Sequence, residues 1–570
     1  MTNAEPVQAI SDRVAGAEVY VYKSPNDVMD GCPVQPLGMN NGHYFFASPD
    51  GEVRELAARD FSWRQILSLF AGDASWLCKT FPKIRKGSED PLWFNETSAA
   101  EGLMRACHRR GLFSSETPLR GPGVWRVGSR AVLHAGDGIY YDGAWLPPGQ
   151  LLGDAIYVAR PALARPDFKF PLGLDATREL RAWLNAWSFE DPRDADLLFG
   201  FLGAALLGGF PTWRVHAIVS GERGCGKSSL GEYLEACFGP MCTSLNNYTE
   251  AGLRQSLRNE ARPILLDEGE GDDDSRRMSS VITLLRTLSS GEGARIVRGS
   301  SGGQAQRTTL MGCVMLLAIN PPHLEPQDRS RIVEFALKPP HVSPTSAQDL
   351  EFFKTEAAKR STALRARALV GAPHFSAAFQ TYRKALVAAS CDGRQADMWA
   401  TLLGGRSMLL DERPPTPEQA DTVVARYADR LEAMKAEDRE ASDGKGCLHH
   451  LFDTMMDIYQ SNHKLTVGQM LAACLFDPLL PDAALQAYGL RIMRGEDIGD
   501  TALAVLSDHV QLRKIYATTP WRCGGWHNSL KRLPGVKPSE HPVRVGGVKR
   551  RVVLIPFSML PREKPPPGDL

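Results

Sequence analysis

Residues Gly221 to Ser228 read GERGCGKS, and this glycine-rich pattern constrains the fold more than any other segment of the chain. An apolar run from Val215 to Val219 leads directly into it, and the stretch from Ser229 to Phe238 contains no proline. This is the order of a strand, a phosphate-binding loop and a helix whose first N–H groups point at an anion. The pattern therefore predicts an α/β nucleotide-binding core built on a parallel sheet flanked by helices.

Each residue type in the loop has a use in binding a triphosphate. The glycines let the backbone wrap around the phosphates, the lysine places a charge beside the β- and γ-phosphate oxygens, and the serine hydroxyl can ligate Mg²⁺. The alternative is a chance glycine turn, which would seldom place both Lys and Ser after the last glycine. ATP and Mg²⁺ are the predicted cofactors. The predicted ATP-binding residues are Gly221, Glu222, Arg223, Gly224, Cys225, Gly226, Lys227, Ser228 and Ser229.

Two further apolar runs end in polar residues that suit hydrolysis. The run Pro263 to Leu266 ends in Asp267 and Glu268. The aspartate can join Ser228 in holding Mg²⁺, and the glutamate can polarise the attacking water. The other run, 313–319, ends in Asn320, whose amide can position a water beside the γ-phosphate. An acidic turn and an Asn-Pro turn are the plainer alternatives for these two sites.

An arginine pair follows a short way along the chain. The sequence Asp328-Arg329-Ser330-Arg331 stands before the apolar run Ile332 to Leu337. One of the two arginines, Arg329 or Arg331, can stabilise transition-state charge on the nucleotide of a neighbouring subunit. An ion-paired surface turn is the alternative.

The order and spacing of these motifs resemble the AAA+ ATPases of the superfamily-three helicase type, specifically the primase-helicase replication proteins of phages, plasmids and integrated elements. The resemblance covers roughly residues 200–340. It implies a homohexameric ring that binds single-stranded or forked DNA. Such proteins carry a basic hairpin between the acidic strand and the Asn strand, and here Arg295, Arg298 and Arg307 lie in that interval. These arginines can contact phosphates, whereas a solvated loop is the alternative.

The overall composition limits where DNA could bind. Lys plus Arg and Asp plus Glu each total 66, so the formal net charge is zero and any DNA contact must be a local patch. The 11 cysteines are scattered without a C-x-x-C pair, which is typical of a reducing cytosol. The N-terminus lacks a signal pattern, and the apolar runs are short for a membrane span. We expect a soluble protein of the bacterial host cytoplasm with no membrane partner.

The regions flanking the ATPase are less informative. No zinc-ribbon cysteines or paired acidic motifs of a primase precede the ATPase, so a separate primase or loading protein is the expected partner. The predicted regions are a small α+β module (1–115), a β-rich segment (116–165), a helical collar (166–207), the AAA+ ATPase (208–340), a helical region (341–445), a winged-helix-like domain (446–560) and a disordered tail (561–570).

A basic stretch near the C-terminus is the second candidate DNA surface. Between residues 511 and 551 ten basic residues face one acid, with Trp521 and Trp526 interleaved, which suits a DNA-binding helix and wing. The wing would pair Val543–Val545 with Arg551–Ile555 around two glycines. A merely soluble face is the alternative. The predicted contacts are Lys531, Arg532, Lys549, Arg550 and Arg551.

The motifs together predict an ATP-dependent DNA helicase or origin-melting ATPase in the replication of a phage or mobile element. A regulatory or defence NTPase, which would switch protein interactions without unwinding DNA, is the main alternative. A small-molecule kinase fits less well, because the Asp-Glu pair and the distal arginines suit hydrolysis better than phosphorylation of a substrate.

Overall fold

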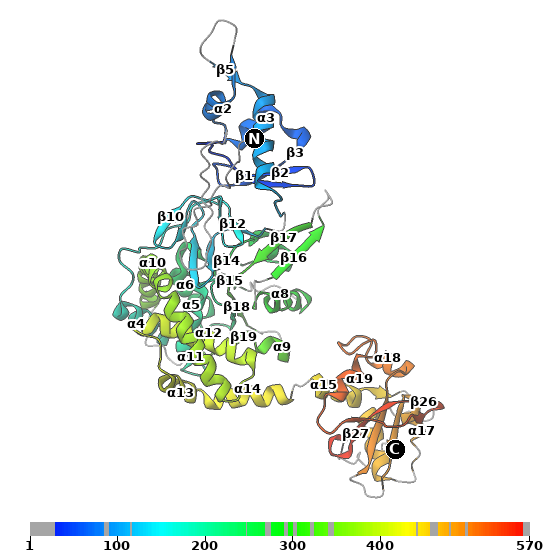
Figure 1. Cartoon of the computed structure of the whole chain (residues 1–570). Helices are drawn as coiled ribbons and strands as arrows, with labels where there is room; N and C mark the ends of the chain where they lie inside the picture. The colour runs from blue at the N-terminus through cyan, green and yellow to red at the C-terminus, as the bar shows by residue number, and fades with distance from the viewer. Residues whose placement is uncertain are drawn as a thin grey trace. The chain divides into compact units, whose positions relative to one another are not determined.

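The computed structural model shows two compact units, which divide between Ala428 and Asp429 (Figure 1). Among the described helices, none is long and apolar enough to cross a membrane. The structure describes residues 29–84, 91–114, 117–246, 248–267, 275–289, 294–299, 305–319, 324–339, 347–440, 443–456, 465–477, 480, 482–495 and 500–561.

The first unit begins with a small α+β layer. A three-stranded antiparallel sheet and the helix α3 share one apolar core, which contains Phe46 and Leu103. The elements of this layer are β1 (Gln35–Asn40), β2 (His43–Ala47), β3 (Val53–Ala57), η1 (Ala58–Asp60), α1 (Trp63–Leu69), α2 (Ser75–Thr80), β4 (Pro82–Ile84), β5 (Pro91–Phe94) and α3 (Glu96–Arg110).

A β-rich segment follows and is bonded to the central sheet region. The N–H of Gly121 donates to the carbonyl of Asn259 at 2.6 Å, and Ala261 donates to Pro122 at 2.9 Å. The strands form two small sheets with the orders β10-β9-β8-β7 and β11-β12-β6. They are β6 (Leu119–Arg120), β7 (Gly123–Val127), β8 (Arg130–His134), β9 (Ile139–Tyr141), β10 (Ala144–Leu146), β11 (Gln150–Leu152) and β12 (Ala155–Tyr157).

The centre of this unit is a parallel five-stranded sheet with the order β14-β15-β18-β13-β19, which confirms the predicted parallel α/β core. Its elements are β13 (His216–Gly221), α6 (Lys227–Phe238), η3 (Gly239–Met241), β14 (Thr243–Leu245), α7 (Glu250–Ser256), β15 (Ile264–Asp267), α8 (Ser275–Leu288), β16 (Ala294–Gly299), β17 (Ala305–Leu310), β18 (Val314–Ala318), α9 (Pro326–Arg329) and β19 (Ile332–Leu337).

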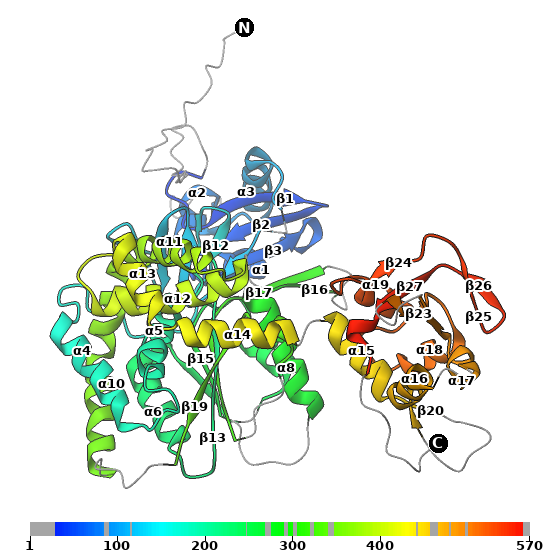
Figure 2. The same ribbon diagram turned by 90° about the horizontal axis from the view of Figure 1, so that it is seen from below.

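Helices cover both faces of this sheet, whose three central strands are mostly apolar and buried. Leu265 and Leu317 approach Gly231 of α6, whereas their neighbours Leu266 and Leu316 share a core with α8. Successive side chains of a strand point to opposite faces. Helix α6 therefore lies on one face of the sheet and α8 on the other (Figure 2).

The predicted collar forms two helices joined through a 3-10 turn and an irregular segment. Pro192 lies in that segment, and proline supplies no N–H to a helix. Further helices follow the sheet, and α14 crosses the division between the units. The elements are α4 (Leu174–Trp183), η2 (Leu184–Ala186), α5 (Asp194–Leu206), α10 (Ala347–Val370), α11 (Ala372–Ala388), α12 (Gly393–Leu410), α13 (Pro417–Ala425) and α14 (Ala428–Glu440).

Helices α5 and α12 cross at very short range, because glycines occupy the crossing. A Cβ atom placed on Gly200 would lie 2.1 Å from the carbonyl oxygen of Leu402, and one on Gly405 would lie 2.2 Å from the carbonyl oxygen of Gly200. Both separations are far below van der Waals contact. Only residues without a side chain fit there.

We expect Gly405→Ala to destabilise the first unit by about 1–3 kcal/mol, because the added methyl group must push two packed helices apart. Gly393→Ala on the same helix is the control, since its added methyl group meets no atom within 4 Å. Urea denaturation of both variants measures the difference. Equal stability of the two proteins would show that the crossing tolerates a side chain.

The second unit is built on an antiparallel sheet with the order β22-β23-β27-β24. Its core includes Trp526, Tyr516 and Leu503. The elements are α15 (Asp443–Asp453), β20 (Met455–Met456), β21 (Leu465–Thr466), α16 (Val467–Phe476), α17 (Ala483–Ala487), β22 (Leu490–Met493), β23 (Ala502–Leu506), α18 (Val510–Ile515), α19 (Gly525–Lys531), β24 (Lys537–Pro538), β25 (Val543–Val545), β26 (Val548–Arg550), β27 (Val552–Pro556) and η5 (Phe557–Met559).

Two expectations for this unit are wrong. Strand β25 pairs with β26, whereas the predicted partner region forms β27 and pairs with β23. Val552, Val553 and Ile555 are fully buried, so burial of apolar surface draws this segment into the sheet. Trp526, expected among the basic residues of a DNA-binding helix and wing, is fully buried and donates to the carbonyl of Leu506 at 3.1 Å, so its ring belongs to the core and not to a DNA surface. Of the predicted disordered tail, 561–570, only Pro561 belongs to the described part of the chain, and residues 562–570 lie outside it.

Candidate active site

The glycine-rich loop, residues 221–228, joins the carboxyl end of β13 to the start of α6. Gly226 has a φ of 91°, a conformation that residues with a side chain rarely adopt. A Cβ atom there would also lie 3.1 Å from the ring of Trp187. Backbone conformation and packing therefore both require glycine at this position. The loop turns into the helix in the manner that places N–H groups toward an anion.

The Lys227 ammonium lies against this loop. Its Nζ donates to the carbonyl of Gly221 at 2.6 Å and to that of Glu222 at 2.9 Å, and it lies 3.7 Å from the Cys225 sulfur. Phosphate oxygens can replace these carbonyl acceptors. Cys225 is buried, whereas Ser228, at the first turn of α6, is exposed. Glu222, Arg223 and Gly224 are exposed as well, so this side of the loop is open to a ligand.

Trp187, an aromatic residue of the predicted collar, supports the loop, a contact that the sequence did not predict. Its indole Nε1 donates to the carbonyl of Gly226 at 3.0 Å and lies 3.1 Å from the Ser229 hydroxyl. Its ring packs 5.5 Å from that of Tyr233 on α6, and the side chain is buried. A single tryptophan far upstream of the loop carries no sequence signal for this contact.

The carboxyl edge of the sheet gathers the predicted chemical groups. Asp267 ends β15 and pairs in register with Leu317 near the end of β18, and β18 lies directly beside β13. Because parallel strands end at one edge, Asp267 and the loop share that edge. Glu268 and Asn320 come after β15 and β18 in the sequence but lie outside the described residues, so their roles stay predictions.

Arg329 and Arg331 lie at the opposite edge of the sheet. They precede β19, and the carbonyl of Arg331 accepts from the N–H of His216 at the start of β13. The loop follows Gly221, which pairs with Leu337 at the far end of β19. Six residues of strand separate Arg331 from Leu337, about 20 Å. Neither arginine can reach the loop of its own subunit.

The two arginines differ in their surroundings. Arg331 is 9% exposed; its guanidinium donates to the carbonyl of Gln327 and lies 5.8 Å from the centroid of the Trp213 ring. Burial lowers the pKa of Arg331 from its ordinary value. Arg329 is half-buried and donates through Nε to the carbonyl of Leu324 at 3.1 Å. Arg329 is therefore the more accessible of the pair.

An ion pair fixes the turn that carries these arginines. Asp328 is 2% exposed and accepts two hydrogen bonds from Arg286 of α8, at 2.8 and 3.1 Å. Below the turn, His216 is fully buried, and desolvation together with the nearby Arg214 lowers its pKa to about 3. His216 is therefore neutral, and its Nδ1 accepts from the N–H of Val314, which joins β13 to β18.

The predicted DNA-contacting residues fall in two places. Arg295 and Arg298 lie on β16 and Arg307 on β17, and these strands form an antiparallel hairpin in which Arg298 pairs with Gln306. In the second unit the other predicted contacts are all exposed. Two of them form ion pairs: Arg532 lies 3.4 Å from Asp443, and Arg550 lies 2.8 Å from Asp508. These other contacts are Lys531, Arg532, Lys549, Arg550 and Arg551.

No protein-family model matches this chain, and no curated protein does. Among solved structures, the apo C-terminal region of NrS-1 is 12% identical; the match covers 93% of this chain and 97% of that one, with a TM-score of 0.31. A JCV helicase bound to a small molecule is 15% identical, and the match covers 35% of this chain and 55% of that one, with a TM-score of 0.23. At such TM-scores neither likeness decides the function of this chain.

Proposed function

We propose that this chain is an ATP hydrolase that acts on DNA as a ring of identical subunits, a helicase or origin-melting ATPase for the replication of a phage or mobile element. One observation carries the proposal. The glycine-rich loop and Asp267 lie at one edge of the parallel sheet, and the arginine turn lies at the other. This arrangement suits an active site that is shared between two subunits, with the loop of one subunit facing the arginine turn of the next.

Within one subunit, the residues at the carboxyl edge fit a magnesium-bound triphosphate. The Lys227 ammonium and the loop N–H groups offer donors to phosphate oxygens, while the Ser228 hydroxyl and the Asp267 carboxylate are oxygen ligands of the kind Mg²⁺ prefers. Bound Mg²⁺ would supply neutralisation of phosphate charge. Glu268 would take the proton of the attacking water, and Asn320 would orient that water.

The neighbouring subunit would supply Arg329. A cation that cannot reach its own loop can still stabilise the charge of a transition state across an interface. Arg331 would hold the turn in place through its buried contacts with Trp213 and Gln327. Arg286 and Asp328 would fix the same turn to α8, which follows the acidic strand in the chain.

DNA would contact the hairpin β16–β17 and the exposed basic residues of the second unit. The test of the proposal is the ATPase rate of the full chain with and without forked DNA. Stimulation by DNA together with strand separation supports it. Turnover that DNA leaves unchanged would favour the regulatory NTPase, in which hydrolysis switches a protein-binding surface.

We expect the double variant Arg295→Ala, Arg298→Ala to lose DNA-stimulated hydrolysis while its basal rate stays within about twofold, because phosphate contacts position DNA without entering the chemistry. The paired substitution Arg109→Ala, Arg110→Ala, two basic residues at the end of α3, is the control and should keep full stimulation. Rates are measured across a titration of single-stranded DNA. Parallel loss of basal and stimulated rates would place the hairpin in folding or subunit contact instead.

We expect Trp187→Phe to weaken ATP binding about threefold to tenfold, since phenylalanine keeps the ring contact but leaves the Gly226 carbonyl without the indole donor. Trp125→Phe is the matched control: Trp125 is buried and donates to the carbonyl of Gly121 at 2.8 Å, away from the loop. Calorimetric titration with a non-hydrolysable ATP analogue measures both. Equal weakening in both variants would indicate a general loss of stability.

A further inference from the structure

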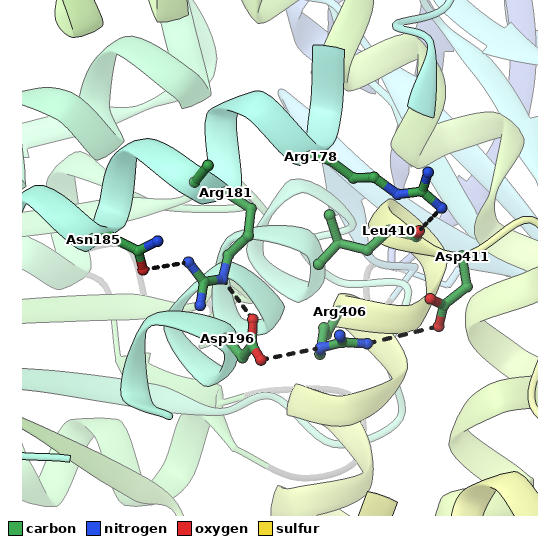
Figure 3. Close-up of a pocket in the computed structure, with 8 residues that line it drawn as sticks. Arg178, Arg181, Asn185, Asp196, Arg406, Leu410 and Asp411 are labelled. Atoms are coloured by element: carbon green, nitrogen blue, oxygen red, sulfur yellow. Dashed lines mark hydrogen bonds and ion pairs between the residues drawn. The ribbon is translucent and has the colours of Figure 1, made fainter. Parts of the chain in front are cut away.

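A surface cavity of about 390 Å³ lies between the collar and the later helices of the first unit, and none of its lining residues belongs to the glycine-rich loop. Helices α4 and α5, the turn between them and α12 form its walls (Figure 3). Three arginines and two aspartates line it, with no aromatic side chain. The lining residues are Arg178, Arg181, Ala182, Asn185, Asp196, Arg406, Leu410 and Asp411.

One acid of the cavity is already neutralised. The Asp196 carboxylate accepts from Nε of Arg181 at 2.5 Å, and Arg181 also donates to the Asn185 side chain at 2.9 Å. These three side chains satisfy one another, as Figure 3 shows. The charge left over is that of Arg178 and Arg406 against Asp411 and against Asp175, which lies 3.5 Å from Arg178 outside the cavity lining.

The remaining two arginines keep most of their donors unused. Arg406 lies 3.8 Å from Asp196 and 3.8 Å from Asp411, and it makes no hydrogen bond to the residues that the structure describes. Arg178 is 56% exposed in its side chain, with only a 3.4 Å contact to the carbonyl of Leu410 and a 3.5 Å contact to Asp175. The half-buried guanidinium of Arg406, with 23% of its side chain exposed, would gain most from a bidentate anionic acceptor.

A further arginine, Arg367, lies beside the residues that line the cavity. Arg367 of α10 donates to the carbonyls of Leu409 and Leu172, at 2.9 and 3.2 Å, and burial together with the nearby charge of Arg178 lowers its pKa. An anion in the cavity would therefore sit in a net positive field. No aromatic ring is available among the lining residues to stack on a base, so recognition would rest on phosphate oxygens.

We propose that this cavity binds the phosphates of a polyphosphate through the guanidinium groups of Arg178 and Arg406, with Asp411 as the internal competitor. A free polyphosphate and the backbone of a nucleic acid share this chemistry, and the volume exceeds that of a single phosphate. The site is separate from the loop that binds ATP in the proposed function. Its occupant would tie α4 to α12.

The test uses inorganic pyrophosphate and the full chain carrying Lys227→Ala, so that the glycine-rich loop does not contribute. We expect calorimetry to show binding that Arg178→Gln with Arg406→Gln weakens about tenfold or more. Arg394→Gln is the control, because this exposed arginine lies on the same helix as Arg406 but outside the cavity. Asp411→Asn should tighten binding about threefold or more, since it removes the competing carboxylate.

Unchanged pyrophosphate affinity in the double variant, with an unchanged thermal melt, overturns the proposal. Should the double variant unfold, the Asp411→Asn protein decides: a damaged fold cannot tighten binding, and an affinity equal to that of its parent overturns the proposal. Single-stranded DNA separates the two sources. Displacement of pyrophosphate by DNA assigns the cavity to the nucleic-acid backbone, and its failure to compete assigns it to a free polyphosphate.

Discussion

Lys227→Ala is expected to weaken ATP binding by about 100-fold or more, whereas Glu268→Gln should bind ATP normally and lose hydrolysis about 10²–10⁴-fold. The physical difference is the stage at which each group acts. The Lys227 ammonium already lies against the loop, where it would contact the phosphates of bound ATP in the ground state. Glu268 would act on the attacking water, whose charge changes only in the transition state.

Equilibrium binding of a fluorescent ATP analogue and a phosphate-release assay measure the two effects separately. Glu351→Gln, an exposed acid on α10, is the control for the loss of one carboxylate and should behave as the parent protein. Robust turnover by purified Glu268→Gln would remove that residue from its assigned role. Tight binding of the ATP analogue by Lys227→Ala would show that the glycine-rich loop is not the ATP-binding site.

The second large effect concerns Arg329. Alone, Arg329→Ala should lower the turnover number on the order of 10³-fold while leaving ATP affinity nearly unchanged, because the arginine would act on a neighbour's nucleotide. Mixing it with Lys227→Ala should restore activity. A Lys227→Ala subunit keeps Arg329 and can donate it to an Arg329→Ala subunit, whose own loop is intact.

The expected recovery can be calculated. At equal mixing half of the subunits have an intact loop, and half of their neighbours supply Arg329, so about one interface in four is complete. Mixtures of Lys227→Ala with Glu268→Gln are the matched control: both defects lie in one pocket, so no interface is complete. If subunits exchange and the first mixture never exceeds its components, the shared active site does not exist.

Arg331 should behave differently from Arg329. The sequence places both in one turn with the same charge, and only the packing separates them. Arg331 is shielded from solvent and contacts the ring of Trp213, which lies over a hundred residues away in the sequence. No local sequence pattern encodes such a contact. We attribute a structural role to Arg331 for this reason.

Apolar runs predicted four of the five strands of the central sheet, and the short strand β14, with the sequence Thr-Ser-Leu, was not predicted. The run 332–337 coincides with β19, and the runs before Asp267 and Asn320 differ from β15 and β18 by a residue or two. Strands buried on both faces have continuous apolar sequences, so their limits are visible in the chain. The loop residues were identifiable for a similar reason, since each position needs a particular residue type.

Contacts between distant segments could not be predicted in this way. The turn at Gly546 and Gly547 is present as expected. The strand directly after it is β26, whose three residues pair with β25, whereas Val552–Pro556 forms β27 in another sheet. A turn signal fixes where the chain reverses but does not decide which apolar segment the core recruits. Trp187 was missed for the same reason, because its bond to Gly226 joins segments 39 residues apart.

The glycine crossing of α5 and α12 has a consequence for how the protein is made. Twelve of the 13 residues of α5 are buried in the folded unit, and much of that cover comes from α12, which ends at Leu410. A ribosome needs about 10–40 s to synthesise the intervening residues at ordinary speeds. For that interval a helix that is apolar after its first turn emerges without its partner, so the nascent chain exposes apolar surface that favours aggregation until α12 appears.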